Sequence, residues 1–468
     1  MAKLPNFLVI IRSEKLSGKG QGRGVGVRKK ERFVLGKRTF RSQKSKHFVL
    51  RIILLRHNVL LSVISILGTA FAICLIMVMV IAWQVKYRGA PPETNLERTM
   101  FIKSFTVRLT SQNGWYTSWY CTPALMKDLV LPSPYIETAT SATAVSVAVL
   151  ATPDESARAS VDFRYTDAMF WKVYEFDFID GRPFADTDLQ DDGSEAIVIS
   201  AGVARRLFGT EHVAGRSVLM NRHLKRIVGV VRDPSLTAIH AYAQLWCMYP
   251  ANLLRTPKEA DEYAGDFEIS ILARNAKDFQ AIYDDIHNRK AQMNTSLADY
   301  ELDIYNQPDD SMTARNRIFP DPDMKGMYWQ YGIVLFIILL VPALNLCGLS
   351  SSRMQQRMSE LGVRKAYGST RMMLVRRILD ENLVLTILGG IVGFVFSYGA
   401  VYLLRGWIFS TFWTVYSHGE IILPVSSLFS PAVFAYALLF CLLMNLLSAG
   451  IPAWYASRKP IVVSLNDN

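Results

Sequence analysis

The sequence predicts an α-helical membrane protein with four transmembrane helices and a large mixed α+β domain outside the membrane. Three observations lead to this fold class: four long apolar segments, an excess of Lys and Arg in three of the polar segments, and alternating apolar patterns between the first two apolar segments. The chain has 468 residues, 50% of them hydrophobic, and a formal net charge of +12. At this length we expect more than one folded unit.

Each apolar segment is long enough to cross a bilayer, which takes roughly 20 residues in a helix. The four predicted spans are residues 59–85, 329–349, 383–404 and 428–451. The first is too long and too far from Met1 for a cleaved signal peptide, and it lacks a small-residue cleavage site after a short apolar core. We therefore expect it to remain as a membrane helix.

The positive charges predict the orientation, because Lys and Arg stay on the cytoplasmic side of membranes. Residues 1–56 hold 16 Lys and Arg against 2 Glu, the loop 350–378 holds 7 against 1 Glu, and the tail 452–468 holds Arg458 and Lys459. With four spans, all three segments lie in the cytoplasm. Residues 86–327 and the short loop 405–427 then lie outside.

The N-terminal region divides into two parts. Residues 1–47 are rich in Gly, Ser, Lys and Arg and are predicted to form a flexible basic tail. Residues 48–58 mix apolar residues with Arg51 and Arg56, which is typical of an amphipathic helix at the membrane interface.

The external domain is acidic, with 24 Lys and Arg against 33 Asp and Glu in residues 89–327, a net charge of −9. A nucleic-acid-binding protein presents a basic folded face, so the acidic domain argues against this class. Two β-α-β units are predicted to bracket an inserted β-rich subdomain at about 155–255. The bracketing strands are predicted at 104–109, 140–150, 267–273 and 300–305, and the helices at 123–130 and 276–293. Helical spacing in the second helix places Phe279, Ile282, Tyr283 and Ile286 on one apolar face.

Within the insert, residues 195–200, 213–218 and 225–231 are predicted as strands, and residues 204–209 as a short helix that ends at Gly209. Phe176 to Phe184 is predicted as a strand end and a turn. This pattern favours a small sandwich or a barrel-like module.

No catalytic, cofactor-binding or metal site is predicted. The sequence lacks the phosphate-binding loop, the common hydrolase motifs and a Cys/His cluster with zinc spacing. Asp191 and Asp192 lack the spacing of a calcium loop. Cys121 and Cys247 both fall in the external domain, and whether they pair is left open because sequence does not fix the distance between them.

Residues 360–368 form a short basic segment between two apolar segments. A solvated linker is one interpretation, and a coupling helix that docks on a partner protein is the other. In the second, Leu361 and Val363 supply apolar contact, and Gly368 ends the helix in a left-handed conformation. The predicted coupling residues are Glu360, Leu361, Gly362, Val363, Arg364, Lys365, Ala366 and Gly368. Arg371, Arg376 and Arg377 could instead meet anionic lipid headgroups.

The third apolar segment carries a stripe of small residues, Gly389, Gly393 and Ser397. Such stripes allow membrane helices to pack closely. The partner helix, from the same chain or from a second subunit, is left open.

From residue 48 onward the sequence resembles the MacB/FtsX-type permeases of ABC transporters. The order of the matching segments, together with four spans, carries the resemblance. Three segments resemble the family's periplasmic core, and four resemble its second cytoplasmic loop, third helix and C-terminal tail. These segments are 176–184, 197–209 and 227–233, followed by 360–368, 374–381, 388–393 and 452–460.

The resemblance implies a non-catalytic permease subunit of the bacterial inner membrane that dimerises with a second copy or a paralogue. It implies a cytoplasmic ABC ATPase as partner, which binds the ATP and drives efflux or mechanotransmission to the periplasmic domain. Because no phosphate-binding loop is found here, that ATPase is expected to be a separate chain. A periplasmic partner and the substrate are left open. The alternative hypothesis is a membrane receptor or anchor with an external sensing domain and no ATPase partner.

Overall fold

The structure is a computed structural model. It describes residues 59–87, 89, 91–109, 116–188, 195–255, 260–296, 300–317, 322–337, 340, 348, 363, 367–410, 417–423 and 431–458. The predicted basic tail and interfacial helix lie outside these residues, as do Asp191, Asp192 and most of the second predicted span.

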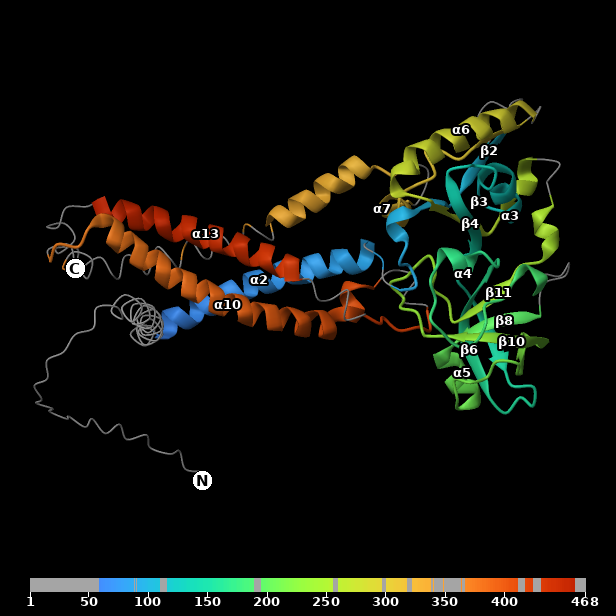
Figure 1. Ribbon diagram of the computed structural model, residues 1–468, viewed down its shortest axis with the longest axis horizontal. Coiled ribbons are helices and arrows are strands. Elements are labelled where there is room, and N and C mark those ends of the chain that lie inside the picture. The colour runs from blue at the N-terminus through green and yellow to red at the C-terminus, as the bar shows by residue number, and fades with distance from the viewer. Residues whose placement is uncertain are drawn as a thin grey trace, which may run out of the picture. The chain divides into compact units, whose positions relative to one another are not determined.

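Three long helices carry the predicted first, third and fourth spans (Figure 1). They are α2 (Val59–Tyr87), α10 (Arg371–Ile408) and α13 (Pro431–Arg458). Helix α10 begins 12 residues before the predicted span, and the Thr370 side chain caps it by accepting a hydrogen bond from the Met373 amide. The helix is therefore continuous from the predicted cytoplasmic loop into the predicted membrane segment.

Two helices of the described chain are long and apolar enough to cross a membrane, Ser62–Tyr87 and Leu379–Ile408. In α13 the apolar part is shorter, Pro431–Met444. Residues 324–337 are helical at the start of the second predicted span, whose remainder is mostly not described. The predicted count of four spans therefore stays a prediction.

The external domain has mixed α/β structure, as predicted, and its described residues form two sheets. In the first sheet the strand order is β1-β13-β3-β2-β14, with β4 beside β13 and β12 beside β3. Its strands are β1 (Thr99–Ile102), β2 (Phe105–Leu109), β3 (Tyr116–Cys121), β4 (Ile136–Thr143), β12 (Ala264–Gly265), β13 (Phe267–Ala273) and β14 (Tyr300–Asp303).

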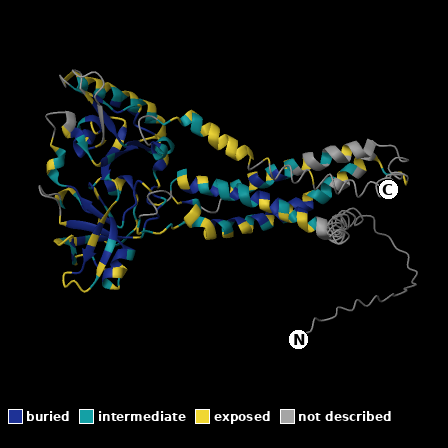
Figure 2. Ribbon diagram, turned by 180° about the vertical axis from the view of Figure 1, so that it is seen from behind, coloured by how far each residue is buried: buried dark blue, intermediate teal, exposed yellow. Residues whose placement is uncertain are grey.

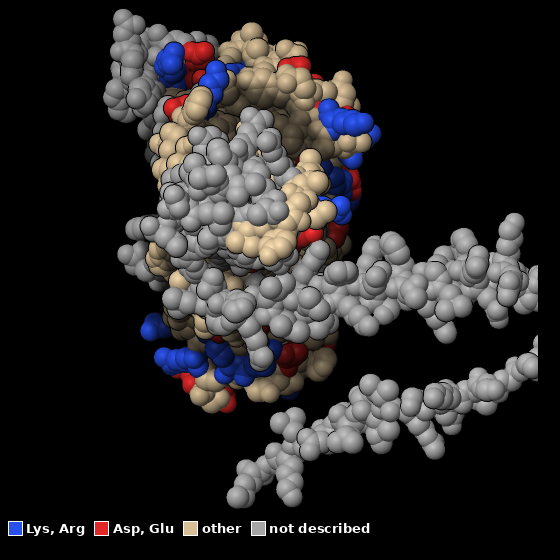
Figure 3. All heavy atoms as spheres, turned by 90° about the vertical axis from the view of Figure 1, so that its left-hand side faces the viewer, with Lys and Arg blue, Asp and Glu red and all other residues tan. Residues whose placement is uncertain are grey.

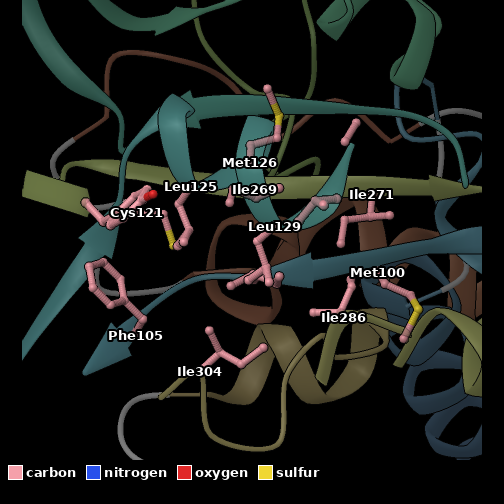
Figure 4. Packing of buried hydrophobic residues seen from close by; sticks show 14 of the residues in the cluster. Met100, Phe105, Cys121, Leu125, Met126, Leu129, Ile269, Ile271, Ile286 and Ile304 are labelled. Carbon is pink, nitrogen blue, oxygen red and sulfur yellow. The ribbon is translucent and has the colours of Figure 1, made fainter. Parts of the chain in front are cut away.

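Helix α6 (Phe279–Ser296) packs Ile282 and Ile286 into the core beneath this sheet, which confirms the apolar face predicted there. The short segments α3 (Pro123–Leu125) and η3 (Met126–Val130) contribute Leu125, Met126 and Leu129 to the same core (Figure 4). The helix predicted at 123–130 is thus one turn of α-helix followed by a π-helical turn.

The second sheet has the order β7-β10-β8-β11-β6-β5-β9, with a further pairing between β10 and β9. Strand β10 bonds to β9 through its first half and to β8 through its second half, so six strands close into a ring. The barrel-like form of the prediction is confirmed. These strands are β5 (Ser146–Ala151), β6 (Arg158–Thr166), β7 (Phe178–Gly181), β8 (Ala196–Ser200), β9 (Ser217–Met220), β10 (His223–Val231) and β11 (Leu245–Met248).

Several boundaries differ from the prediction. The strand expected at 213–218 begins only at Ser217, and the helix expected at 204–209 is Ala201–Phe208. The largest difference concerns the start of the β-rich insert. The run 140–150 was expected to be one strand, but β4 and β5 belong to different sheets and are separated by Ala144 and Val145. The β-rich insert therefore begins at Ser146 rather than near residue 155. A continuous run of small and β-branched residues does not reveal this break, because both strands are equally apolar.

The ring encloses its own core, and helix α5 (Ala201–Phe208) supplies Val203, Ala204 and Leu207 to it. Gly209 ends α5 with φ +71°, as predicted for a left-handed C-cap. A third core, rich in aromatic residues, lies around α4 (Phe170–Val173) and includes Trp246 and Leu272, one from each sheet. Figure 2 shows that buried positions concentrate in the two sheets. The remaining short helices are η2 (Leu96–Arg98), η4 (Asp186–Asp188), η5 (Ala251–Leu254), η6 (Ala260–Tyr263), η7 (Ala276–Asp278) and α7 (Ser311–Asn316).

Candidate functional site

The predicted coupling segment is described only at Val363, Tyr367 and Gly368. The Tyr367 amide donates to the Val363 carbonyl over 3.1 Å, the spacing of an α-helical turn. Gly368 follows with φ +89°, so the left-handed conformation predicted for it is confirmed. Val363 and Tyr367 are exposed, at 45% and 88%. Glu360, Leu361, Gly362, Arg364, Lys365 and Ala366 lie outside the described residues, so their role stays a prediction.

The small-residue stripe of α10 packs against α2 of the same chain. A Cβ added at Gly389 would lie 2.8 Å from the Thr69 Cβ, and one at Gly393 would lie 3.0 Å from the Ala70 Cα. Ser397 is fully buried and donates its hydroxyl proton to the Phe394 carbonyl over 2.7 Å. The partner helix that the sequence left open is therefore intramolecular for both glycines.

The opposite faces of these helices are apolar and exposed. Phe71 on α2 and Phe396 and Leu403 on α10 are 62%, 64% and 80% exposed. Meanwhile α2, α10 and α13 bury a joint core that includes Ile73, Val401, Ala437 and Cys441. A helix that is apolar on both its packed and its exposed face suits a bilayer, where the exposed face meets lipid.

A buried ion pair joins the two chain segments that connect the external domain with the first and second predicted spans. Glu93 follows α2 closely, and Arg315 lies on α7, shortly before residues 324–337. The Arg315 guanidinium donates to Glu93 Oε2 over 2.6 Å, and the two side chains are 3% and 1% exposed. Burial raises the pKa of Glu93 above its ordinary value, while the positive charge of Arg315 and two backbone amides oppose this shift.

The amides that Glu93 accepts from belong to the loop between β10 and β11. The His240 amide donates to Glu93 Oε1 over 2.7 Å, and the Ala241 amide over 3.1 Å. The His240 ring is buried and stacks on Phe101 with ring centroids 4.0 Å apart. Burial and nearby cations hold the pKa of His240 well below its usual range, so the ring is neutral at pH 7.

The same loop also contacts residues 417–423, which follow α10 in the chain. The Asp162 carboxylate on β6 is 1% exposed and accepts from the His418 amide over 2.7 Å and from the Tyr242 hydroxyl over 2.6 Å. The His418 Nδ1 lies 2.9 Å from Asp162 Oδ1. Gly419 sits directly on the Tyr242 ring, where a Cβ would collide with the hydroxyl. These residues were not found from the sequence, since no spacing or motif links positions 256 apart.

A second buried ion pair, between Arg317 and Asp309, lies next to the first sheet. Both side chains are 3% exposed, and the Asp309 backbone exchanges hydrogen bonds with Phe101 on β1. The connection to the second predicted span is therefore anchored to both sheets, through Arg315 and through Arg317.

The described residues hold no group of three or more His, Cys, Asp or Glu side chains able to bind a metal.

Cys121 and Cys247 are free and buried in separate cores, below the first sheet and inside the ring. On the face drawn in Figure 3, basic and acidic side chains of the described residues are interspersed. The buried ion pairs and hydrogen bonds described above connect the external domain to the segments next to the predicted spans.

Two family models match the chain in sequence order. The MacB-like periplasmic core domain matches residues 62–289, and the FtsX-like permease C-terminal domain matches residues 332–461. Together the matches cover more than half of the chain.

Curated relatives agree with these matches. The pyoverdine export ATP-binding/permease protein PvdT of Pseudomonas syringae pv. syringae is 24% identical over 237 residues, which are 50% of this chain and 34% of that protein. The ABC transporter permease YknZ of Bacillus subtilis, uncharacterised, is 23% identical over 281 residues, 58% of this chain and 67% of that protein. The chain thus spans about a third of the length of the Pseudomonas relative.

Among solved structures, the extracellular domain of YknZ from Gram-positive bacteria aligns with a TM-score of 0.29 and 16% identity, covering 43% of this chain and 99% of that domain. With both family models matched in order, and with relatives that are ABC transporter permeases, the chain belongs to the MacB/FtsX-type permease family of ABC transporters.

Proposed function

We propose that this protein is the permease subunit of an ABC transporter and passes ATP-driven movement of a separate cytoplasmic ATPase to its external domain. The observation that carries the proposal is the combination, in one chain, of the MacB-like domain and the FtsX-like permease domain. The proposed activity is export or mechanotransmission, and the partner chain binds the ATP.

The proposal includes four spans at 59–85, 329–349, 383–404 and 428–451, with both termini in the cytoplasm of a bacterial cell and the domain at 86–327 in the periplasm. The charge distribution supports this orientation, because residues 1–56, 350–378 and 452–468 are basic and share one side. The permease works as a dimer with a second copy or a paralogue.

The ATPase docks on residues 360–368. Leu361 and Val363 give apolar contact, and Glu360, Arg364 and Lys365 set the register by charge. Gly362 allows close approach, Ala366 keeps the helix narrow, and Gly368 ends it. The exposure of Val363 and the left-handed backbone of Gly368 support this role.

The test is co-purification of the ATPase. The tagged chain is extracted from its native membrane in mild detergent, and bound proteins are identified by mass spectrometry. We expect an ABC ATPase to be recovered with the wild type and to be lost from the Glu360→Lys and Arg364→Glu variants. The matched control is Arg376→Glu together with Arg377→Glu, which changes charge on α10 outside the segment.

Three outcomes separate the alternatives. Retention of the ATPase by both segment variants would reject residues 360–368 as the docking site. Equal loss from the control would show that general loop charge, through lipid headgroups, is responsible. Recovery of no nucleotide-binding protein with the wild type would reject the permease proposal and favour a receptor or anchor.

A further inference from the structure

We propose that residues 235–244, the loop between β10 and β11, form the element through which movement of the membrane helices reaches the ring-shaped β-subdomain. We call this segment the transmission loop. The inference rests on the proposed permease function and assigns the route of transmission to named residues. It follows from the contacts that the loop makes with three separate segments adjoining the helices.

The first two contacts come from the segments next to the first and second predicted spans. Glu93 holds the loop by accepting from the amides of His240 and Ala241. Arg315 donates to the Thr237 carbonyl over 3.3 Å while it is paired with Glu93. The loop backbone is thus bonded to both members of one buried ion pair.

The third contact comes from residues 417–423, between α10 and α13. The Leu236 amide donates to the Glu420 carbonyl over 3.2 Å, and the Ile422 amide donates to Ser235 Oγ over 3.1 Å. At the other end of the loop, Gln244 Nε2 donates to the His418 carbonyl over 3.3 Å. Bonds at both ends of the loop leave little room for residues 417–423 to move independently of it.

The loop is equally well fixed to the ring. Arg164 on β6 donates to the carbonyls of Ile239 and His240. The Gln244 amide donates to the Asp162 carbonyl over 2.7 Å, and the Gln244 carbonyl accepts from the Ser200 amide over 2.9 Å. The loop is therefore hydrogen-bonded to β6 and β8, and it continues along the chain into β11.

The physical properties of these contacts suit transmission of a displacement. Ala241, Tyr242 and Ala243 are buried at 4% exposure or less, so they cannot yield into solvent. Separating Glu93 from Arg315 would leave a buried charge without its partner, which is costly. Displacement of a helix end is therefore expected to move the loop as a unit, because close-packed interiors transmit strain.

A competing route runs through the first sheet, where Arg317 pairs with Asp309 and Asp309 bonds to Phe101 on β1. That route carries the connections to the first and second predicted spans, because β1 follows α2 in the chain. The transmission loop differs because it receives contacts from all three segments and leads into the ring.

The experiment measures hydrogen exchange in the full complex, purified with its ATPase and placed in nanodiscs, with and without ATP and vanadate. The main variant is Gly419→Ala, whose added methyl group collides with the Tyr242 ring and separates residues 417–423 from the loop. The matched control is Gly406→Ala on α10, where no atom of the residues that the structure describes lies within 4 Å of an added Cβ. His418→Ala, which removes the ring bonded to Asp162 without adding bulk, serves if Gly419→Ala does not assemble.

In the wild type and in Gly406→Ala, we expect ATP with vanadate to change exchange in residues 235–248 and in β6. In Gly419→Ala and His418→Ala, we expect this change to be lost. The rate of ATP hydrolysis should stay within about twofold of the wild-type rate, which corresponds to less than about 0.5 kcal/mol in activation free energy. A role limited to folding would alter exchange equally with and without ATP.

Two results would overturn the inference. An undiminished ATP-dependent change in β6 in both variants would show that transmission bypasses the loop, through the Asp309 route or otherwise. The absence of any ATP-dependent change in the wild type complex, or of the ATPase itself, would overturn the proposed function and the inference with it. The first result leaves the proposed function intact, so the two failures are distinguishable.

Discussion

The Glu93 carboxylate lies 2.6 Å from the Arg315 guanidinium, although the two residues are 222 positions apart in the chain. The pair joins the segment after α2 to the segment before the second predicted span, at a position that is almost completely buried. Since a buried charge requires a partner, this contact fixes how the two segments meet.

Removing one charge of this pair should be costly. Glu93→Gln keeps an oxygen for the His240 and Ala241 amides but leaves Arg315 buried without a counter-charge, which typically costs about 3–5 kcal/mol. The measurement is urea unfolding of the chain in detergent, followed by tryptophan fluorescence. The double variant Glu93→Gln, Arg315→Met should recover most of the lost stability. A loss in the double variant that equals the sum of the losses in the two single variants would contradict the pairing.

The contact between α10 and α2 should not tolerate a methyl group at Gly393. The added Cβ would collide with the Ala70 carbonyl, so Gly393→Ala should destabilise the helix packing by about 1–3 kcal/mol. Gly399→Ala on the same helix meets no atom in the described part of the chain and should be neutral or stabilising by up to about 1 kcal/mol. The measurement is the thermal unfolding midpoint of each variant in detergent. Equal midpoints for Gly393→Ala and Gly399→Ala would argue against this packing.

The backbone of Gly368 should matter for binding of the proposed ATPase. Among the described residues, no atom lies within 4 Å of a Cβ at this position, so Gly368→Ala is expected to cost the strain of a left-handed backbone, about 1–2 kcal/mol. We expect reduced ATPase recovery for Gly368→Ala and partial restoration for Gly368→Asn, because Asn tolerates this conformation better. Recovery that is unchanged for Gly368→Ala would show that the turn is not required for docking.

Asp167 should make stability depend on pH. Its carboxylate accepts from Thr140, Ser141, Phe170 and Tyr249, but burial raises its pKa from 3.8 to about 6. Because the folded pKa is the higher one, the stabilisation is full below pH 4 and is lost as pH rises through about 6. The change amounts to about 3 kcal/mol.

The measurement is the free energy of unfolding at pH 4 and pH 7 for the wild type and for Asp167→Asn. Relative to the variant, the wild type should lose about 3 kcal/mol over this range. A constant difference between the two proteins would mean that Asp167 titrates normally in the fold.

Cys121 and Cys247 should both be found as free, unreactive thiols. Burial raises the pKa of the Cys247 thiol to about 12 and that of Cys121 well above its ordinary value, so neither forms the reactive thiolate at pH 8. Alkylation with N-ethylmaleimide, read by peptide mass spectrometry, should modify both only after denaturation. A peptide pair linked by a disulfide before reduction would contradict the structure.

Much of the local structure was predictable from the sequence. The apolar face of α6 at Ile282 and Ile286 follows from helical periodicity, and the left-handed residues Gly209 and Gly368 follow from the rule that glycine ends helices. The break between β4 and β5 was not predictable, because strand propensity continues through Ala144 and Val145 while the chain passes from one sheet to the other.

The apolar segments, the charge asymmetry across the predicted membrane and the type of most elements could be inferred from the sequence, since they depend on residues close together in the chain. The folded structure was needed to show that Gly389 and Gly393 pack on α2, that six strands close into a ring, and that Cys121 and Cys247 lie in different cores. It also brought Glu93 to Arg315 and Asp162 to His418. These contacts join residues separated by up to 256 positions, and they are set by burial and by the pairing of buried charges, which leave no periodic pattern in the sequence.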